Sequence, residues 1–297
     1  MHRPTRRDFL KSSAAASAFT ALTGRVNGTP VKRAATDWVT LGSSGVQVTR
    51  LAFGTGTYSG QVQRELGQDA FTRLVRHAYD SGIRFFETAD SYEGMPQMLA
   101  IALKGLPRDS YRLMTKYNLH DDEKPHATID RLRSDLGADY VDILLLHCVR
   151  SPTWPQDAKR LEDAFSEAKA KKIILSHGAS VHGLPALRAF PGNEWLDVAM
   201  IRMNHNGTRM DTPDTRDTDN IGNVSEVVTH MKQVHSQGKG VISMKLVGEG
   251  RFKTPEDRQA SLNFAFNVAG VDSVTIGYKN TREVDEAIER VNRALSV

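Results

Sequence analysis

The stretch Val141-Asp142-Ile143-Leu144-Leu145-Leu146-His147 is a short apolar run that ends in an ionisable side chain. Helical patterns flank it, and a further β-rich run lies beyond each of them. Eight such runs alternate with amphipathic stretches along the chain. They cover residues 51–53, 84–87, 111–116, 141–147, 173–176, 198–201, 241–244 and 274–276.

This alternation predicts an α/β fold, a closed (β/α)₈ TIM barrel, because the helices can cover the outer face of a parallel sheet. Helices are expected over residues 70–81, 128–136, 161–170, 224–237, 258–268 and 282–295. Short strands at 39–41 and 46–49 surround Gly42-Ser43-Ser44-Gly45 and predict an N-terminal β-hairpin that caps the barrel. A doubly wound sheet is the main alternative, but no Gly-x-Gly-x-x-Gly follows the first barrel strand.

The composition is that of an ordinary globular protein, with 297 residues, 39% of them hydrophobic and 25% charged. The single cysteine, Cys148, leaves no internal disulfide and no Cys-x-x-Cys pair for zinc. The first 35 residues hold seven Lys or Arg and one Asp, so the other 262 residues carry −2 of the total charge of +4. This mildly acidic body, without a run of cations, argues against nucleic-acid partners.

The basic leader Thr5-Arg6-Arg7-Asp8-Phe9-Leu10-Lys11 precedes an alanine-rich stretch at 12–24 that is too short and too polar to span a bilayer. A disordered basic tail is the alternative interpretation. The leader resembles the twin-arginine export signal, which implies the translocon as a partner, a periplasmic location and transport of an already folded protein. The expected organisation is a signal and linker at 1–35 and a barrel domain at 36–297.

Four ionisable residues fall at or just after three successive predicted strands, where a barrel places its active site. They are Glu87, Tyr92, Lys116 and His147. A Lys116 ammonium beside Tyr92 is expected to lower the pKa of the phenol, with Glu87 holding the ammonium in place. A neutral His147 imidazole can orient a carbonyl oxygen. A structural Glu87–Lys116 ion pair and a buried core histidine are the simpler alternatives.

With these residues, the segments at 41–48, 53–56, 82–92, 115–116, 141–147 and 178–180 resemble the aldo/keto reductase superfamily over essentially the whole body. The resemblance implies an NADP(H)-dependent oxidoreductase, with NAD(H) as the alternative cofactor, that acts on a small carbonyl or alcohol substrate. It implies Tyr92 as the general acid, tuned by Lys116 and Glu87, and His147 as the residue that orients the carbonyl. The implied cofactor-binding residues are Gly54, Thr55, Ser180, Met200, Gly277, Lys279 and Arg282.

The chain departs from the family pattern at several of these positions. Glu87 replaces the usual Asp, Val181 the usual Asn, Met200 the usual Gln and Met244 the usual stacking aromatic residue. Glu283 stands where a cation or amide often contacts the adenosine phosphate. Fewer polar contacts to a nicotinamide are therefore expected.

Two other functions are considered. A metal-dependent hydrolase or lyase would use His147, His177, His182 and His205, but the first predicted strand lacks a His-x-His pair. A barrel that binds nucleotide without turnover is the other. The polar loop at 204–222 holds Asp217-x-Asp219-x-x-Gly222, but Ile221 and Val228 occupy ligand positions of a calcium loop. A substrate-side lid or a mobile loop is expected there instead. No metal site is predicted, and the sequence does not define the oligomeric state.

Overall fold

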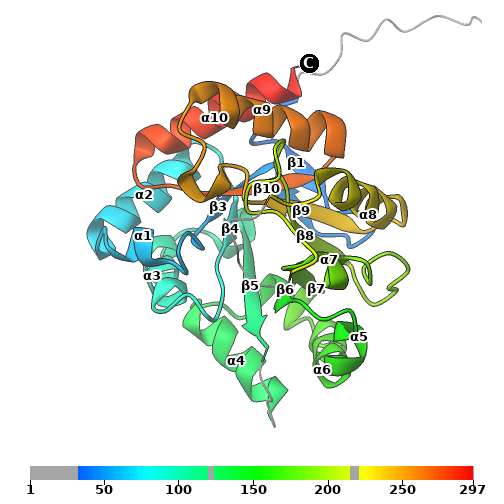
Figure 1. Cartoon of the computed structure of the whole chain (residues 1–297). Coiled ribbons are helices and arrows are strands. Elements are labelled where there is room, and N and C mark those ends of the chain that lie inside the picture. Colours follow the sequence, from blue (N-terminus) through cyan, green and yellow to red (C-terminus); the bar gives the residue numbers. More distant parts are fainter. Residues whose placement is uncertain (1–32, 120–123, 215–220, 297) are drawn as a thin grey trace, which may run out of the picture. The chain divides into compact units, whose positions relative to one another are not determined.

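The computed structural model describes residues 33–119, 124–214 and 221–296. Eight parallel strands close into a barrel in the order β10-β3-β4-β5-β6-β7-β8-β9 (Figure 1). The strands are β3 (Leu51–Gly54), β4 (Phe85–Glu87), β5 (Arg112–Asn118), β6 (Val141–Val149), β7 (Ile174–Val181), β8 (Val198–Arg202), β9 (Gly240–Met244) and β10 (Ser273–Gly277). The predicted TIM barrel is confirmed. Nearly all of the predicted leader, together with Asp217 and Asp219, lies outside the described residues.

Helices surround the strands (Figure 1). The longer ones are α2 (Gln68–Asp80), α3 (Met95–Leu103), α4 (Pro125–Asp135), α6 (Lys159–Ala170), α8 (Val224–Ser236), α9 (Pro255–Asn263) and α10 (Thr281–Leu295). The short ones are α1 (Gln61–Arg64), α5 (Trp154–Asp157) and α7 (Leu184–Leu187), with 3₁₀ turns at Arg108–Ser110 and Gly248–Gly250. Helical periodicity does not single out α3, because its residues are apolar on nearly every side. Among the described residues no helix is both long and apolar enough to cross a membrane.

The apolar core has two parts, one inside the barrel and one between the strands and the helices. Along β3, Leu51 and Phe53 pack in the outer part and Ala52 in the inner part. This alternation follows from the two-residue period of a strand. It fixes which polar side chains can face the interior.

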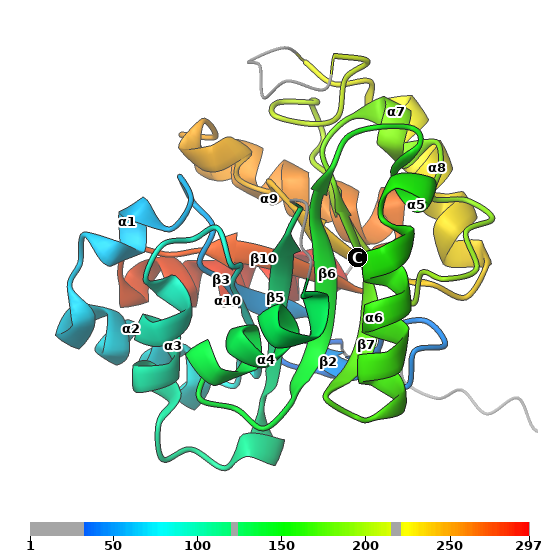
Figure 2. The same ribbon diagram turned by 90° about the horizontal axis from the view of Figure 1, so that it is seen from below.

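The N-terminal hairpin, β1 (Trp38–Thr40) paired with β2 (Gln47–Thr49), is confirmed. Leu41, Val46 and Val48 pack with the inner core of the barrel. Gly42 forms a bridge to Lys239, just before β9 begins. In Figure 2 the hairpin lies at the lower end of the barrel, while the arrowheads of β5 and β6 point to the opposite end. The hairpin therefore fills one end and leaves the carboxyl ends of the strands for a site.

Two elements differ from the sequence expectation. β7 runs on from the predicted end at Ser176 to Val181, because Gly178 lets the strand approach β8 closely. A Cβ at Gly178 would lie 1.8 Å from the Val198 carbonyl oxygen. The predicted helix at 258–268 is α9 followed by a π-helix at Phe264–Ala269. In that wider turn Ala265, Phe266 and Ala269 all stay buried.

The loop after β8 is anchored to the barrel by buried polar contacts. Asp211 accepts hydrogen bonds from Arg202 Nε at 2.8 Å and from the Gly183 amide at 2.7 Å. The Asn204 side chain donates to the Thr208 and Lys245 carbonyl oxygens. The described part of this loop rises above the carboxyl ends of the strands (Figure 2).

Candidate active site

Three neighbouring strands bring the four ionisable residues together. Glu87 ends β4, Tyr92 lies in the loop that follows, and Lys116 and His147 come from β5 and β6. The Lys116 ammonium forms an ion pair with Glu87. It also donates hydrogen bonds to the Thr88 carbonyl oxygen at 3.0 Å and to the Tyr92 hydroxyl at 3.3 Å. The sequence therefore predicts this contact network correctly, despite the longer side chain of Glu87.

Glycine makes room for the Tyr92 hydroxyl. A Cβ at Gly56 would lie 2.5 Å from the Tyr92 hydroxyl oxygen. A Cβ at Gly54 would lie 2.6 Å from Thr275 Oγ1 and 3.0 Å from Glu87 Oε2. The distances of 2.5 and 2.6 Å are shorter than real Cβ contacts, so any other residue would displace the Tyr92 hydroxyl or the Thr275 side chain.

Burial dominates the electrostatics of the site. It lowers the pKa of the Lys116 ammonium to about 7. It also raises the pKa of the Tyr92 hydroxyl, and the nearby Cys148 and Glu249 raise it further. The expectation that Lys116 lowers the pKa of Tyr92 is therefore wrong for this structure. The physical reason is that desolvation of the buried phenolate outweighs its stabilisation by the neighbouring ammonium.

His147 lies beside Tyr92 and is held by a serine. The two rings are nearly perpendicular, with centroids 5.5 Å apart. Ser91 Oγ lies 3.1 Å from His147 Nδ1. Burial, followed by the nearby Lys116 charge, holds the pKa of His147 well below its ordinary value. The imidazole is therefore neutral near pH 7. In the tautomer with its proton on Nε2, Nδ1 accepts a hydrogen bond from the Ser91 hydroxyl.

Two adjoining cavities lie next to these residues. The smaller, of about 70 Å³, is lined by Gly54, Gly56, Glu87, Tyr92 and residues from β8, β9 and β10. The larger, of about 350 Å³, lies between the loop after β3, the loop after β9, and α9 and α10. They share the lining residues Thr57, Val247, Glu249, Ile276 and Gly277. Together they make a trough that runs from Tyr92 to the start of α10.

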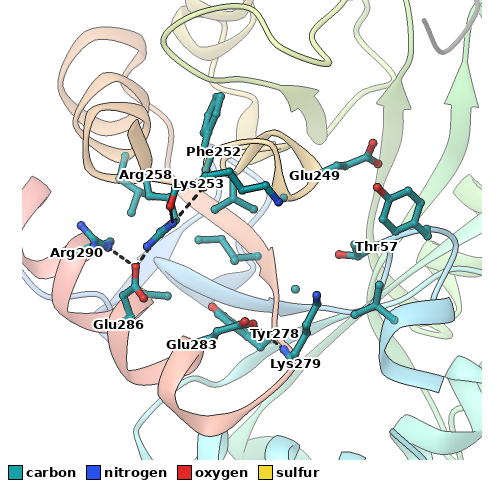
Figure 3. A pocket seen from close by; sticks show the side chains of 18 residues that line it. Thr57, Glu249, Phe252, Lys253, Arg258, Tyr278, Lys279, Glu283, Glu286 and Arg290 are labelled. Atoms are coloured by element: carbon teal, nitrogen blue, oxygen red, sulfur yellow. Dashed lines mark hydrogen bonds and ion pairs between the residues drawn. The ribbon is translucent and has the colours of Figure 1, made fainter. Parts of the chain in front are cut away.

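Charged side chains of both signs line the larger cavity (Figure 3). Lys253 and Lys279 extend into it, whereas Arg258 and Arg290 both bind Glu286, at 2.8 and 2.7 Å. Glu283 accepts a hydrogen bond from the Lys279 amide at 2.7 Å. Asn280 caps α10 by accepting from the Glu283 amide. A capped helix N-terminus with a lysine beside it is a site suited to a phosphate group.

A model of the Aldo/keto reductase family matches residues 50–296. The chain belongs to this family. A model of the twin-arginine translocation (TAT) pathway signal sequence matches residues 3–23. Among curated relatives, L-galactose dehydrogenase from Arabidopsis thaliana is 35% identical over 155 residues, which are 49% of this chain and 48% of that protein. The chain spans about half the length of the first curated relatives it matches.

Solved aldo-keto reductases share the fold of this aldo/keto reductase. The holo form from Bacillus halodurans superimposes with a TM-score of 0.68 at 17% identity, covering 87% of this chain and 95% of that one. The Klebsiella pneumoniae enzyme in complex with NADPH gives a TM-score of 0.63 at 17% identity, covering 90% of each chain. At such low identity this similarity shows the fold alone.

The structure gathers only some of the predicted cofactor-binding residues around the trough. Gly54, Met200 and Gly277 line the smaller cavity, and Gly277 and Lys279 line the larger one. The other three predicted residues, Thr55, Ser180 and Arg282, line neither cavity. Thr55 is buried and donates to the Glu87 carbonyl oxygen, Ser180 accepts from the Cys148 amide, and Arg282 is exposed.

The four histidines of the metal-hydrolase alternative do not form one cluster. His177 stacks on Trp195 with ring centroids 4.5 Å apart, and His205 packs against Phe252. Within 33–119, 124–214 and 221–296, no group of three or more His, Cys, Asp or Glu residues could hold a metal ion. The described part of the chain therefore offers this alternative no ligand set.

Several residues of the site are not predicted from the sequence. Ser91 holds His147, and Gly56 makes room for Tyr92. Arg209, Lys245 and Glu249 form ion pairs at the rim of the trough. Lys245 directly follows a predicted strand, which is the one local signal that could have pointed to it. Arg209 lies inside a long polar loop, where no pattern distinguishes it.

Proposed function

We propose that this aldo/keto reductase is an NADP(H)-dependent oxidoreductase that interconverts a small carbonyl compound and its alcohol, with Tyr92 as the general acid. The observation that carries the proposal is the contact of the Tyr92 hydroxyl with the buried Lys116–Glu87 pair at the end of the trough. NAD(H) is the alternative cofactor, since Glu283 would repel a 2′-phosphate near Lys279.

The trough suits a nicotinamide dinucleotide on three grounds. Gly277 forms part of its floor, where a Cβ would lie 2.7 Å from Thr57 Oγ1. Tyr278 is one of its lining residues, and the buried Tyr278 hydroxyl has no hydrogen-bond partner among the described atoms. Lys279 and the capped start of α10 supply positive charge at its outer end. When bound, such a cofactor supplies or accepts a hydride.

Each residue near Tyr92 has a proposed part in the proton transfer. The neutral His147 imidazole donates a hydrogen bond from Nε2 to the substrate carbonyl oxygen and so orients it. Tyr92 gives its hydroxyl proton to that oxygen as the alkoxide forms, and the Lys116 ammonium stabilises the phenolate that remains. Glu87 holds Lys116 in place. In alcohol oxidation the same groups act in reverse.

Fewer polar side chains would hold the nicotinamide ring than the family pattern provides. Met200 and Met244 belong to the inner apolar core and offer sulfur in place of an amide or an aromatic face. Ser180 accepts one hydrogen bond through Oγ from the Cys148 amide, so its own hydroxyl proton stays available to a carboxamide oxygen. We propose that Gly54, Thr55, Met200 and Ser180 surround the ring, and that Gly277, Lys279 and Arg282 face the phosphates.

Residues 1–35 are proposed to act as the export signal and linker, and residues 36–297 as the reductase domain. The match to the TAT signal sequence at 3–23 supports export by the twin-arginine pathway. We propose the periplasm as the destination. Because that route carries folded proteins, the cofactor would be acquired before export.

The test has two parts. Protein exported natively is denatured, and the NADP(H), NAD(H) and metal that it releases are quantified; about one nucleotide per chain is expected. Tyr92→Phe is then expected to lower kcat for carbonyl reduction by about 10²–10⁴-fold, the usual contribution of a general acid, with cofactor affinity unchanged. Tyr79→Phe, which removes a hydroxyl bonded to Ser110 away from the trough, is the control.

Retained activity in Tyr92→Phe would contradict the assignment of the acid. Nucleotide binding without turnover on a broad panel of aldehydes, ketones and sugars would favour the non-catalytic barrel instead.

A further inference from the structure

A hydrogen bond inside the barrel joins two strands that are not neighbours. Thr275 lies on β10 and Glu87 ends β4, and β3 runs between these two strands. The Thr275 hydroxyl nevertheless donates to Glu87 Oε2 at 3.4 Å. Both residues are almost fully buried, with 7% of Thr275 and 3% of Glu87 exposed. The carboxylate next to Tyr92 is therefore held from the opposite side of β3.

Gly54 on β3 makes this contact possible. It pairs with Gly277 of β10 on one side and with Glu87 of β4 on the other. Ile276 packs in the outer part of the core, so strand alternation points the preceding Thr275 side chain inward. A Cβ at Gly54 would lie 2.6 Å from the Thr275 hydroxyl oxygen and 3.0 Å from Glu87 Oε2. Glycine thus leaves room for the hydroxyl to reach past β3.

Each oxygen of the Glu87 carboxylate has a partner of its own. Oε1 accepts from the Lys116 ammonium, and Oε2 accepts from Thr275. The ammonium also donates to the Thr88 carbonyl oxygen and to the Tyr92 hydroxyl, which uses all three of its protons. A buried ion pair compensates for its lost hydration only where further hydrogen bonds satisfy its remaining polar atoms. Without the Thr275 hydroxyl, the carboxylate would be free to turn away from Lys116.

We propose that Thr275 is a positioning residue for the reaction at Tyr92, and that it acts through Glu87 to keep the Lys116 ammonium against the Tyr92 hydroxyl. The proposal rests on the proposed function and deepens it, because it adds a residue of β10 to the groups that control the proton transfer. Thr275 also lines the smaller cavity together with Glu87 and Tyr92. A side chain that only filled space there would not affect the charge of Lys116.

The charge of Lys116 can be followed without turnover, by NMR of isotope-labelled lysine side chains over a range of pH. Lys116→Met identifies the signal. Thr275→Val keeps the shape of the side chain and removes its hydroxyl. Burial already lowers the pKa of Lys116 to about 7. In Thr275→Val we expect that pKa to fall further, by about one unit, because a carboxylate held close to an ammonium favours its charged form.

Two variants on β10 serve as controls. Thr275→Ser keeps the hydroxyl and should restore the wild-type titration of Lys116. Ser273→Ala removes another buried hydroxyl of the same strand, one that donates to the Thr49 and Arg50 carbonyl oxygens instead. It should leave the titration unchanged. If Thr275→Val does not fold, Thr275→Ala removes the same hydroxyl and replaces it in the test.

Other titratable groups also face Lys116, from the loop after β4, from β6 and from the loop after β9. They are Tyr92, His147, Cys148 and Lys245. The variants at Thr275 change none of these residues. Since the Thr275 hydroxyl bonds to Glu87, a change in the titration of Lys116 is transmitted by that carboxylate.

The pH dependence of kcat/KM for carbonyl reduction is the second readout. In Thr275→Val the decrease with rising pH should begin about one pH unit lower than in the wild type, and Thr275→Ser should reverse this change. A Lys116 pKa that stays the same or rises in Thr275→Val would overturn the inference. An equal fall in Thr275→Ser would overturn it as well, because packing and not the hydroxyl would then be responsible.

The two proposals fail in different ways. Turnover that depends on Tyr92, together with an unchanged Lys116 titration in Thr275→Val, would refute the positioning by Thr275 and leave the proposed function intact. The expected NMR titrations in a protein without turnover would refute the proposed function alone.

Discussion

The Lys116 ammonium gives the site its expected pH dependence. Because burial lowers the pKa of Lys116 to about 7, the charge that stabilises the Tyr92 phenolate is lost as the pH rises through that value. Tyr92 itself stays protonated, since burial raises its pKa. We therefore expect kcat/KM for carbonyl reduction to fall about tenfold per pH unit above 7 once the amine is neutral.

A pH–rate profile between pH 5 and 9 measures this effect. Because the pKa of His147 lies well below its ordinary value, no rising limb near pH 6.5 is expected on the acid side. The arginine in Lys116→Arg keeps its charge at every pH of the profile, so the decrease in kcat/KM above pH 7 should disappear. A wild-type profile that is flat from 6 to 9 would show that Lys116 does not change its charge there.

Residue types at or just after strand ends were sufficient to predict the group of four, Glu87, Tyr92, Lys116 and His147, because the carboxyl ends of barrel strands must meet at one mouth. The pKa of Tyr92 could not be predicted in this way. Its direction depends on how deeply the hydroxyl is buried and on Glu249, which is 157 positions away along the chain. The small size needed at Gly56 likewise appears only when the Tyr92 hydroxyl is placed beside it.

At the scale of the element, the end of α6 offers a direct test of backbone strain. Lys172 has φ 58° and follows the C-cap Lys171, and the Ile173 amide bonds back to the Ala168 carbonyl oxygen. Glycine is the usual residue at such a position. We expect Lys172→Gly to raise the free energy of unfolding by about 0.5–1 kcal/mol. Glycine relieves the left-handed strain, and this gain exceeds the cost of the larger conformational entropy that glycine gives the unfolded chain.

Urea denaturation of Lys172→Gly and of Lys171→Gly makes the comparison. Lys171 has an ordinary right-handed φ of −83°, so glycine there should lower the free energy of unfolding by a similar amount. Equal effects at the two positions would mean that the strain at Lys172 is negligible.

Periodicity predicted the strands and most helices but not where β7 ends. The residues His177, Gly178 and Ser180 are poor strand formers, and they extend β7 only because β6 and β8 lie on either side of it. That extension matters for the site, since it places Ser180 against the Cys148 amide. Tertiary pairing, which one sequence does not display, decides such cases.

At the scale of the whole molecule, we expect export to depend on the leader, and folding and activity to depend on the barrel. The match to the TAT signal at 3–23 leads us to expect that Arg6→Lys with Arg7→Lys abolishes export, because the paired arginines are read by a receptor. The retained protein should be folded and active. Fractionation of a host with a working twin-arginine system measures both. Undiminished export of the double variant would refute the assignment of the leader.

The hairpin that fills the lower end of the barrel also has a consequence for the order in which ligands bind and dissociate. With Leu41, Val46 and Val48 packed into that end, molecules approach Tyr92 from the rim, along the trough that adjoins it. A dinucleotide and a substrate would then enter by the same opening. The molecule that binds deeper must therefore bind first and dissociate last. We expect dissociation of the nucleotide, rather than hydride transfer, to be the rate-limiting step of each catalytic cycle.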